Sequence, residues 1–358
     1  MLKLIGRLLL FTPLLAGMMF VSYRVDPSGL FWGAGFERMV CDYMLAGNYV
    51  DGYQQLDGRE LNKIYARECE NAPQVLVNGS SRTLQIDSSF APGKTFYNAA
   101  NVGADVYDFF NSYYIFEKEG KVPEIFLMGI DPWIFNDGEE NIDKRSDSAM
   151  FAQFLAETMG YESPQYTPEN PMEKYTALLD PSYFQASVDT YFRNKDSSSQ
   201  PEIVPPEDIY SRDDIIKAPD GSIVYDLNFR TRNQEIADGD ALTAANNDLL
   251  RLTDFDRLDP YYTQLFEDFI VYLQSKGVEI IFFLPSYHHY LYWEAQDNIE
   301  KYHCLFEVED YIKQMGAKYN IAVYGSYNPD AVGLTNRDFM DGLHMRYEAL
   351  KKVLPVIE

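Results

Sequence analysis

The sequence predicts an α/β fold of three layers, in which a doubly wound parallel β-sheet lies between helices on both faces. Short apolar runs alternate with amphipathic helical patterns from residue 75 to the C-terminus, which is the element order of a parallel sheet. The apolar runs have few polar interruptions, as expected of strands buried on both faces. The chain has 358 residues, 46% of them hydrophobic, which is enough to bury the core of such a fold.

The expected strands and helices follow one another along the chain. The first strand, "VLVN" at residues 75–78, ends in a turn signal, and we expect a helix to begin at Ser81. Further strands are expected at residues 95–98, 125–129 and 278–284 and in "NIAVYG". Helices are expected after Gly103, over residues 261–277 with Gly277 as C-cap, in "EDYIKQMGAKY" and in the C-terminal tail.

Three of the expected strands end in small or polar residues. These ends lie at residues 79–81, 129–131 and 285–287. Ligands of open α/β sheets bind beyond the carboxyl ends of the strands. We therefore expect the three segments to meet at one edge of the sheet and to hold the functional site.

Two further segments surround or interrupt this fold. Residues 25–70 are expected to form a partly helical, membrane-proximal connector before a main domain at residues 71–358. Within that domain, residues 136–247 are a long acidic insertion, with a linker-like stretch "SSSQPEIVPPED" and a predicted hairpin in "APDGSIVYDLNF". We expect the insertion to lie over the sheet rather than to fold as a domain of its own.

The N-terminus, residues 1–24, is interpreted as a transmembrane anchor. An apolar run from Leu8 to Tyr23 is preceded by Lys3 and Arg7, which places the N-terminal end in the cytoplasm. No clear small-x-small cleavage site follows, so an uncleaved signal anchor is favoured over a removed signal peptide. In both cases the bulk of the chain lies outside the cytoplasm.

The net charge and the cysteine content argue against several classes of partner and of functional site. The formal net charge of −25 disfavours nucleic acid and other polyanions as partners and favours a neutral or cationic substrate. None of the three cysteines belongs to a C-x-x-C pair, and we predict neither a metal site nor a cofactor. His303 beside Cys304 is interpreted as structural. A disulfide between Cys41 and Cys69 is an option that the sequence leaves open.

Two segments carry residues suited to catalysis. At the start of a helix, the backbone N–H of Ser81 would be free to stabilise an oxyanion, although serine there is also typical of a helix N-cap. Near the C-terminus, Asp341 lies three residues before His344 in "DGLH". This spacing lets the carboxylate fix the imidazole while the imidazole takes a proton from serine. The alternative for His344 is a surface histidine beside an aspartate.

Together these segments resemble the SGNH/GDSL hydrolase superfamily of flavodoxin-like α/β proteins, whose first block is Gly-x-Ser and whose last block is Asp-x-x-His. The resemblance implies a triad of Ser81, His344 and Asp341, and an oxyanion hole formed by the backbone N–H groups of Ser81 and, from "NAANVG", Gly103. The third block departs from the family, because "GIDP" has Asp131 in place of the oxyanion asparagine. Since a carboxylate repels an oxyanion, we expect Asp131 to turn away or to make a structural contact.

The "GSSR" form of the first block and the predicted anchor are similar to the subgroup that contains DltD, the lipoteichoic acid D-alanylation protein, and the alginate O-acetylation proteins. This resemblance implies extracytoplasmic acyl transfer, chiefly O-acetylation, to a cell-surface polysaccharide or exopolysaccharide. It also implies a membrane-bound O-acyltransferase as the partner that supplies the acyl group. The net charge favours a neutral glucan such as cellulose as acceptor. The same triad would serve a carbohydrate esterase, and the missing asparagine would also fit a non-catalytic protein that binds polysaccharide or a membrane partner.

Three side chains are candidates for substrate binding. Arg82 directly follows the serine and is expected to contact a carbonyl or a carboxylate, or else to be solvated or salt-bridged. His288 is expected to line the site, whereas its neighbour His289 points the opposite way on an extended segment, so the two do not form a metal pair. Trp133 and Trp293 follow strand ends and could stack on a sugar ring, with core packing as the alternative for at least one of them.

Overall fold

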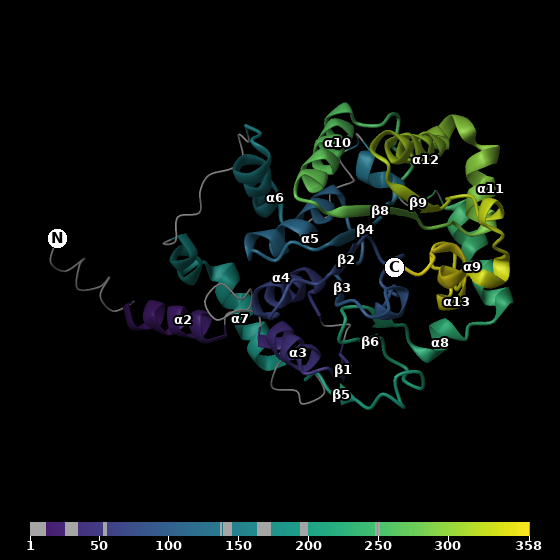
Figure 1. Ribbon diagram of the computed structural model, residues 1–358. Helices are drawn as coiled ribbons and strands as arrows, with labels where there is room; N and C mark the ends of the chain where they lie inside the picture. The colour runs from purple at the N-terminus through teal and green to yellow at the C-terminus, as the bar shows by residue number, and fades with distance from the viewer. Residues whose placement is uncertain are drawn as a thin grey trace.

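The structure, a computed structural model, describes residues 12–25, 35–52, 56–136, 138, 145–162, 173–193, 200–247, 249 and 251–357. The described residues form an α/β body around a parallel sheet, from which an N-terminal helix projects beside a helix of the insertion (Figure 1).

The central sheet has five strands in the order β3-β2-β4-β8-β9, and every pairing in it is parallel. The strands are β2 (Val75–Asn78), β3 (Phe96–Asn98), β4 (Ile125–Gly129), β8 (Glu279–Leu284) and β9 (Ala322–Gly325). Their register aligns Val77 with Leu127 and Leu127 with Ile281. The α/β class and the strands expected from the apolar runs are confirmed.

Helices cover both faces of this sheet. One face packs against helices α4 (Gly58–Glu68), α5 (Val106–Lys118), α10 (Pro260–Ser275) and α12 (Ile299–Tyr319). The other face packs against α13 (Tyr347–Val353) and the segment around Phe90. Consecutive strand residues alternate between the two cores, with Leu76 in the first and Val77 in the second. This arrangement is compatible with the expected three layers.

A second, small antiparallel sheet joins the connector stretch to the insertion. Its strands are β1 (Tyr49–Val50), β5 (Ile203–Val204), β6 (Ile216–Lys217) and β7 (Ile223–Val224), in the order β5-β1-β6-β7. The β6–β7 pair confirms the predicted hairpin. Because β1 pairs with insertion strands and α4 packs on α5, both elements of the connector stretch belong to the folded body.

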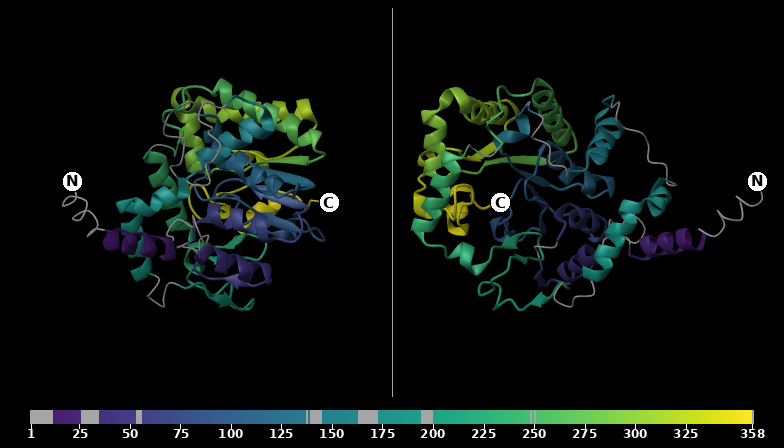
Figure 2. Two further views of the ribbon diagram at one scale, coloured as in Figure 1. Left: turned by 90° about the vertical axis from the view of Figure 1, so that its left-hand side faces the viewer. Right: turned by 180° about the vertical axis from the view of Figure 1, so that it is seen from behind.

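The remaining elements lie mostly around the edges of the body. They are α2 (Thr12–Val25), α3 (Gly35–Leu45), α6 (Ser148–Phe154), the π-helix Leu155–Met159, α7 (Pro181–Arg193), α8 (Leu227–Arg230), α9 (Gln234–Asn246) and α11 (His289–Asp297), with 3₁₀ helices at Ser88–Phe90, Pro132–Phe135, Glu173–Leu179, Asp330–Val332 and Asn336–Asp338. Helix α2 packs along α7, away from the central sheet (Figure 2).

Within the described residues, no helix has both the length and the apolarity needed to cross a bilayer. Part of the expected anchor, residues 1–11, lies outside the described residues. Cys41, Cys69 and Cys304 are all buried and none of them is in a disulfide, so the structure does not contain the Cys41–Cys69 bond. Burial raises the pKa of the Cys41 thiol to about 12, and this thiol is therefore protonated and unreactive at neutral pH.

Candidate active site

The three polar strand ends meet at the carboxyl edge of the central sheet, as expected. Arg82 connects them: its Nη1 donates to Asp131 Oδ1 after β4 at 2.8 Å, and its Nη2 donates to the Pro285 carbonyl after β8. Ser81 therefore lies at an edge whose neighbouring loops are held by buried hydrogen bonds.

Ser81, His344 and Asp341 form a connected row of side chains. His344 Nε2 lies 2.9 Å from Ser81 Oγ, and His344 Nδ1 lies 2.8 Å from Asp341 Oδ2. An ionised aspartate can only accept hydrogen bonds, so Nδ1 carries the ring proton and Nε2 is left to accept the serine O–H. The geometry is that of a nucleophile, a general base and an orienting carboxylate.

The conformation of the loop at "DGLH" explains how Asp341 and His344, three residues apart, come into contact. Asp341 Oδ1 accepts the backbone N–H groups of Leu343 and His344, each at 2.8 Å, which folds the loop back over its own carboxylate. Burial alone would raise the pKa of Asp341, but the hydrogen bond and charge of His344 and these backbone donors outweigh burial and lower it. Asp341 is therefore held in the ionised form that the imidazole needs.

The expected helix at Ser81 is wrong, because residues 81–85 form a turn. Thr83 N–H donates to the Ser80 carbonyl at 3.0 Å, and Gly79 has a φ of 137°. A side chain at Gly79 would meet Thr83 Oγ1 at 2.6 Å and the Gly129 carbonyl at 2.9 Å. The glycine thus permits a tight turn that leaves Ser81 half-buried at the sheet edge, without a helix dipole behind it.

Two aromatic residues of the insertion pack around the catalytic histidine, and our sequence reasoning missed them. The rings of Tyr225 and Phe229 stand edge-on to His344 with centroids 5.8 Å and 5.9 Å away. Tyr225 Oη also donates to the Ser81 carbonyl at 3.1 Å. Their signal in the sequence is a pair of aromatics four residues apart within the segment predicted to form the hairpin. The insertion therefore contributes directly to the site.

Arg82 is not positioned to bind substrate, which corrects the first of our three substrate-binding predictions. The residue is 3% exposed and its guanidinium lies 4.1 Å from the centroid of the Tyr287 ring. Its salt bridge to Asp131 fulfils the expectation that Asp131 makes a structural contact. Burial raises the pKa of Asp131, although Arg82 opposes this effect. The pair is fully occupied in holding the loops together.

His288 and Trp133 are also buried, contrary to the prediction that they bind substrate. His288 is 0% exposed, its Nδ1 accepts the Tyr290 N–H at 3.2 Å, and its Nε2 lies 3.1 Å from Asp238. Trp133 is 3% exposed, and its Nε1 donates to the Ala104 carbonyl at 2.9 Å. Both side chains have structural partners instead of a free surface.

The Gly103 turn lies beside the Ser81 loop. Asn101 N–H donates to the Gly79 carbonyl at 3.0 Å, and Gly103 has a φ of 64°. Arg251 Nη1 donates to the Gly103 carbonyl at 3.1 Å, which fixes this peptide from its carbonyl side. None of the hydrogen bonds found among the described residues involves the Gly103 N–H, and its part in an oxyanion hole stays a prediction.

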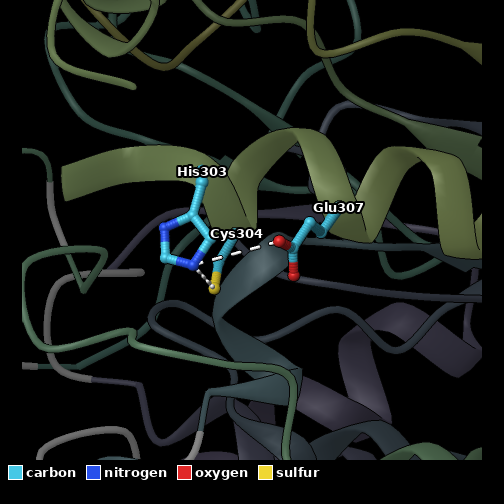
Figure 3. Close-up of side chains that lie close together, drawn as sticks. All are labelled: His303, Cys304 and Glu307. Carbon is cyan, nitrogen blue, oxygen red and sulfur yellow. Dashed lines mark hydrogen bonds and ion pairs between the residues drawn. The ribbon is translucent and has the colours of Figure 1, made fainter. Parts of the chain in front are cut away.

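Among the described residues, one cluster has donors that could hold a metal ion, at His303, Cys304 and Glu307 on α12 (Figure 3). His303 Nε2 lies 3.7 Å from Cys304 Sγ and 3.9 Å from Glu307 Oε1. However, His303 Nδ1 is buried with no hydrogen-bond partner in the described structure, whereas the second nitrogen of a metal-bound histidine ordinarily has one. All three donors also come from one helix, so we assign no function to the cluster.

The fold and this geometry define an α/β protein with a serine–histidine–aspartate site at the carboxyl edge of a parallel sheet. The chain matches no protein-family model and no curated protein. The resemblance to the SGNH superfamily therefore depends on the residues at this site.

Proposed function

We propose that the protein is an SGNH-type acyltransferase that moves an acyl group, in the first instance acetyl, to a polysaccharide hydroxyl. The observation that carries this proposal is the 2.9 Å contact between Ser81 Oγ and His344 Nε2, with Asp341 on the other ring nitrogen. The half-buried position of Ser81 leaves its hydroxyl within reach of a donor, whereas Arg82 and Asp131 beside it are closed off.

In the first half-reaction, Ser81 Oγ attacks the acyl carbon of the donor while its proton moves to His344 Nε2. The bond between the acyl carbon and the donor's leaving group breaks, and the leaving group takes the proton from the imidazolium. Asp341 stabilises that imidazolium, and the backbone N–H groups of Ser81 and Gly103 are expected to bind the oxyanion.

In the second half-reaction, an acceptor hydroxyl attacks the acyl-serine. His344 takes the hydroxyl proton and returns it to Ser81 Oγ as the ester bond to the enzyme breaks. Water as acceptor would make the protein an esterase, and exclusion of water decides between the two outcomes. Tyr225 and Phe229 support transfer, because two aromatic rings packed edge-on against the imidazole make that side of the catalytic base apolar.

The donor and the location are part of the same proposal. The likeness to the alginate O-acetylation proteins suggests a membrane-bound O-acyltransferase as the source of the acyl group, with this chain held at the outer face of the membrane by its first 24 residues. The net charge of −25 supports a neutral acceptor, for which cellulose is our first candidate.

The test is intact-mass spectrometry of the full-length chain incubated with p-nitrophenyl acetate. We expect a gain of one acetyl group that is absent in Ser81→Ala, and free acetate whose release is slow until a cello-oligosaccharide is added. Fast release without any effect of the sugar would identify an esterase. The absence of both adduct and release, with the fold intact by circular dichroism, would contradict catalysis from this donor and favour a binding role.

A further inference from the structure

A groove lies between the small antiparallel sheet, α13 and the turn that begins at Ser81. It has a volume of about 720 Å³, within the range of small-molecule binding sites. Gln85 lines it four residues after Ser81, and Met340 and Arg346 line it on either side of the "DGLH" loop. The groove thus shares two of its walls with the segments that carry the triad, although no triad residue lines it.

The walls of the groove carry three tyrosines, from three different parts of the chain. They are Tyr49 on β1, Tyr210 in the insertion and Tyr347 on α13. Tyr210 is 60% exposed, with the Arg230 guanidinium 5.3 Å from its ring centroid, and Lys351 lies 4.4 Å from that of Tyr347. Large aromatic rings with a polar tip in a concave surface suit ligands that have both apolar faces and hydroxyl groups.

The charges of the lining balance. Three carboxylates, of Asp87, Asp220 and Glu348, face three cations, of Arg230, Arg346 and Lys351.

Several of these charges already have partners. Asp87 accepts the Tyr347 hydroxyl at 2.7 Å, and Asp220 accepts the Ser88 N–H at 2.8 Å. Arg346 donates to the backbone carbonyls of Arg230, Arg232 and Arg337. A groove without net charge, in a chain of charge −25, offers an anionic polymer no attraction.

We propose that this groove binds a segment of a neutral polysaccharide and holds it beside Ser81. Its role as the acceptor site depends on the proposed acyl transfer, whereas the binding itself does not. Sugar rings offer apolar faces to the tyrosines and uncharged hydroxyl groups to the polar atoms between them.

The groove is also connected to the catalytic serine through the β6–β7 hairpin. Ile223 lines the groove, and its N–H donates to the Leu84 carbonyl at 2.9 Å. Two residues later, the Tyr225 hydroxyl donates to the Ser81 carbonyl. A ligand that orders this hairpin would therefore order the aromatic wall of the active site as well.

The experiment is isothermal titration of full-length Ser81→Ala protein with cellohexaose, and separately with a mannuronate hexamer of the same length. Tyr210→Ala is the main test, because an exposed side chain can be removed without damage to the core. Lys351→Ala is the second test. Tyr261→Ala, an exposed tyrosine on α10 that is 48% accessible, is the matched control.

We expect cellohexaose to bind and the mannuronate hexamer to bind more weakly. Tyr210→Ala should weaken cellohexaose binding about tenfold, and Tyr261→Ala should leave it unchanged. Failure of cellohexaose to bind, equal affinity in Tyr210→Ala and the control, or tighter binding of the mannuronate hexamer would overturn the proposal. Intact-mass measurement on wild-type protein with p-nitrophenyl acetate separates the two hypotheses. An acyl-serine without sugar binding refutes the groove alone, whereas sugar binding without an acyl-serine contradicts catalysis from this donor and supports the groove.

Discussion

His344 and His288 each contact an aspartate at the same edge of the fold, yet the two rings are used in opposite ways. His344 turns Nδ1 to Asp341 and leaves Nε2 facing Ser81, whereas His288 turns Nε2 to Asp238 and uses Nδ1 to accept a backbone N–H that caps α11. A histidine can act as a base only if one ring nitrogen is an unoccupied acceptor near a substrate. The helix cap removes that nitrogen from His288.

The two pairs are also linked. His288 N–H donates to the Gly342 carbonyl at 3.0 Å, inside the loop that positions His344. His288 is fully buried, whereas the His344 side chain is 18% exposed. In our proposal the His344–Asp341 pair performs the chemistry. The His288–Asp238 pair supports the loop that positions His344.

The largest effect should come from replacing each histidine by glutamine. His344→Gln should slow formation of the acyl-serine by about 10⁴-fold, because the serine loses its base. His288→Gln should slow it less than tenfold, since it removes only support for the loop. Rates of mass gain with p-nitrophenyl acetate measure both. Equal losses in two folded variants would break the distinction between the pairs.

Replacing the two aspartates should slow the reaction in the same order as replacing the histidines, but by a smaller factor. Asp341→Asn should reduce the rate about 10³-fold, because an amide no longer holds the proton on Nδ1 or stabilises the imidazolium. Asp238 also accepts Gln234 Nε2 at 2.6 Å and its side chain is 28% exposed, so Asp238→Asn should have little effect on the rate. A rate for Asp238→Asn as low as that for Asp341→Asn would assign His288 a part in the chemistry.

The local parts of this site were predictable from the sequence. Continuous apolar runs identified β2, β4 and β8, and the carboxyl-end rule brought Ser81, Asp131 and residues 285–287 to one edge. Asp341 and His344 were found because their contact spans three residues of one loop. In each case a short pattern carries enough information to specify the geometry.

The missed features depend on long-range contacts or very short elements. Arg82 contacts Asp131 and Pro285, which are 49 and 203 residues away in the sequence. No local sequence pattern therefore indicates that Arg82 is buried. The strands of the small sheet have two residues each, too few for a detectable period, and this hid both the pairing of β1 with the insertion and the position of Tyr225 over the site. The helix expected at Ser81 failed because serine favours turns as well as helix starts.

For the free energy of unfolding, His288 should matter more than His344, which is the reverse of their order for the reaction rate. His288→Ala removes the N-cap of α11 and leaves Asp238 with Gln234 in place of its buried histidine partner, and we expect a loss of about 1–3 kcal/mol in the free energy of unfolding. His344→Ala removes a partly exposed side chain from a functional site and should cost about 1 kcal/mol or less. Urea unfolding of both variants measures this difference. A larger loss in His344→Ala would show that the triad, not the buried pair, carries the structural role.

The smallest expected effect is on the pH dependence of the free energy of unfolding. It also gives the sharpest comparison, because the two pairs should act in different pH ranges. Burial lowers the pKa of His288 below 6.5, despite opposition from Asp238, so the unfolded chain binds a proton before the folded chain does as pH falls. This contribution makes stability fall with pH from 6.5 down to the folded pKa. The lowered pKa of Asp341 also makes stability fall as pH falls, but this fall begins near pH 3.8, the ordinary pKa of the group. The stabilising charge is complete above that pH and is lost below it.

The two ranges can be separated with one variant of each pair. In urea unfolding from pH 8 to pH 3, His288→Gln should flatten the decline that begins near pH 6.5, and Asp341→Asn should flatten only the decline below about pH 4. If His288→Gln left the upper range unchanged, His288 would titrate normally in the folded protein. That result would mean that the hydrogen bond and charge of Asp238 fully offset the effect of burial on the pKa of His288.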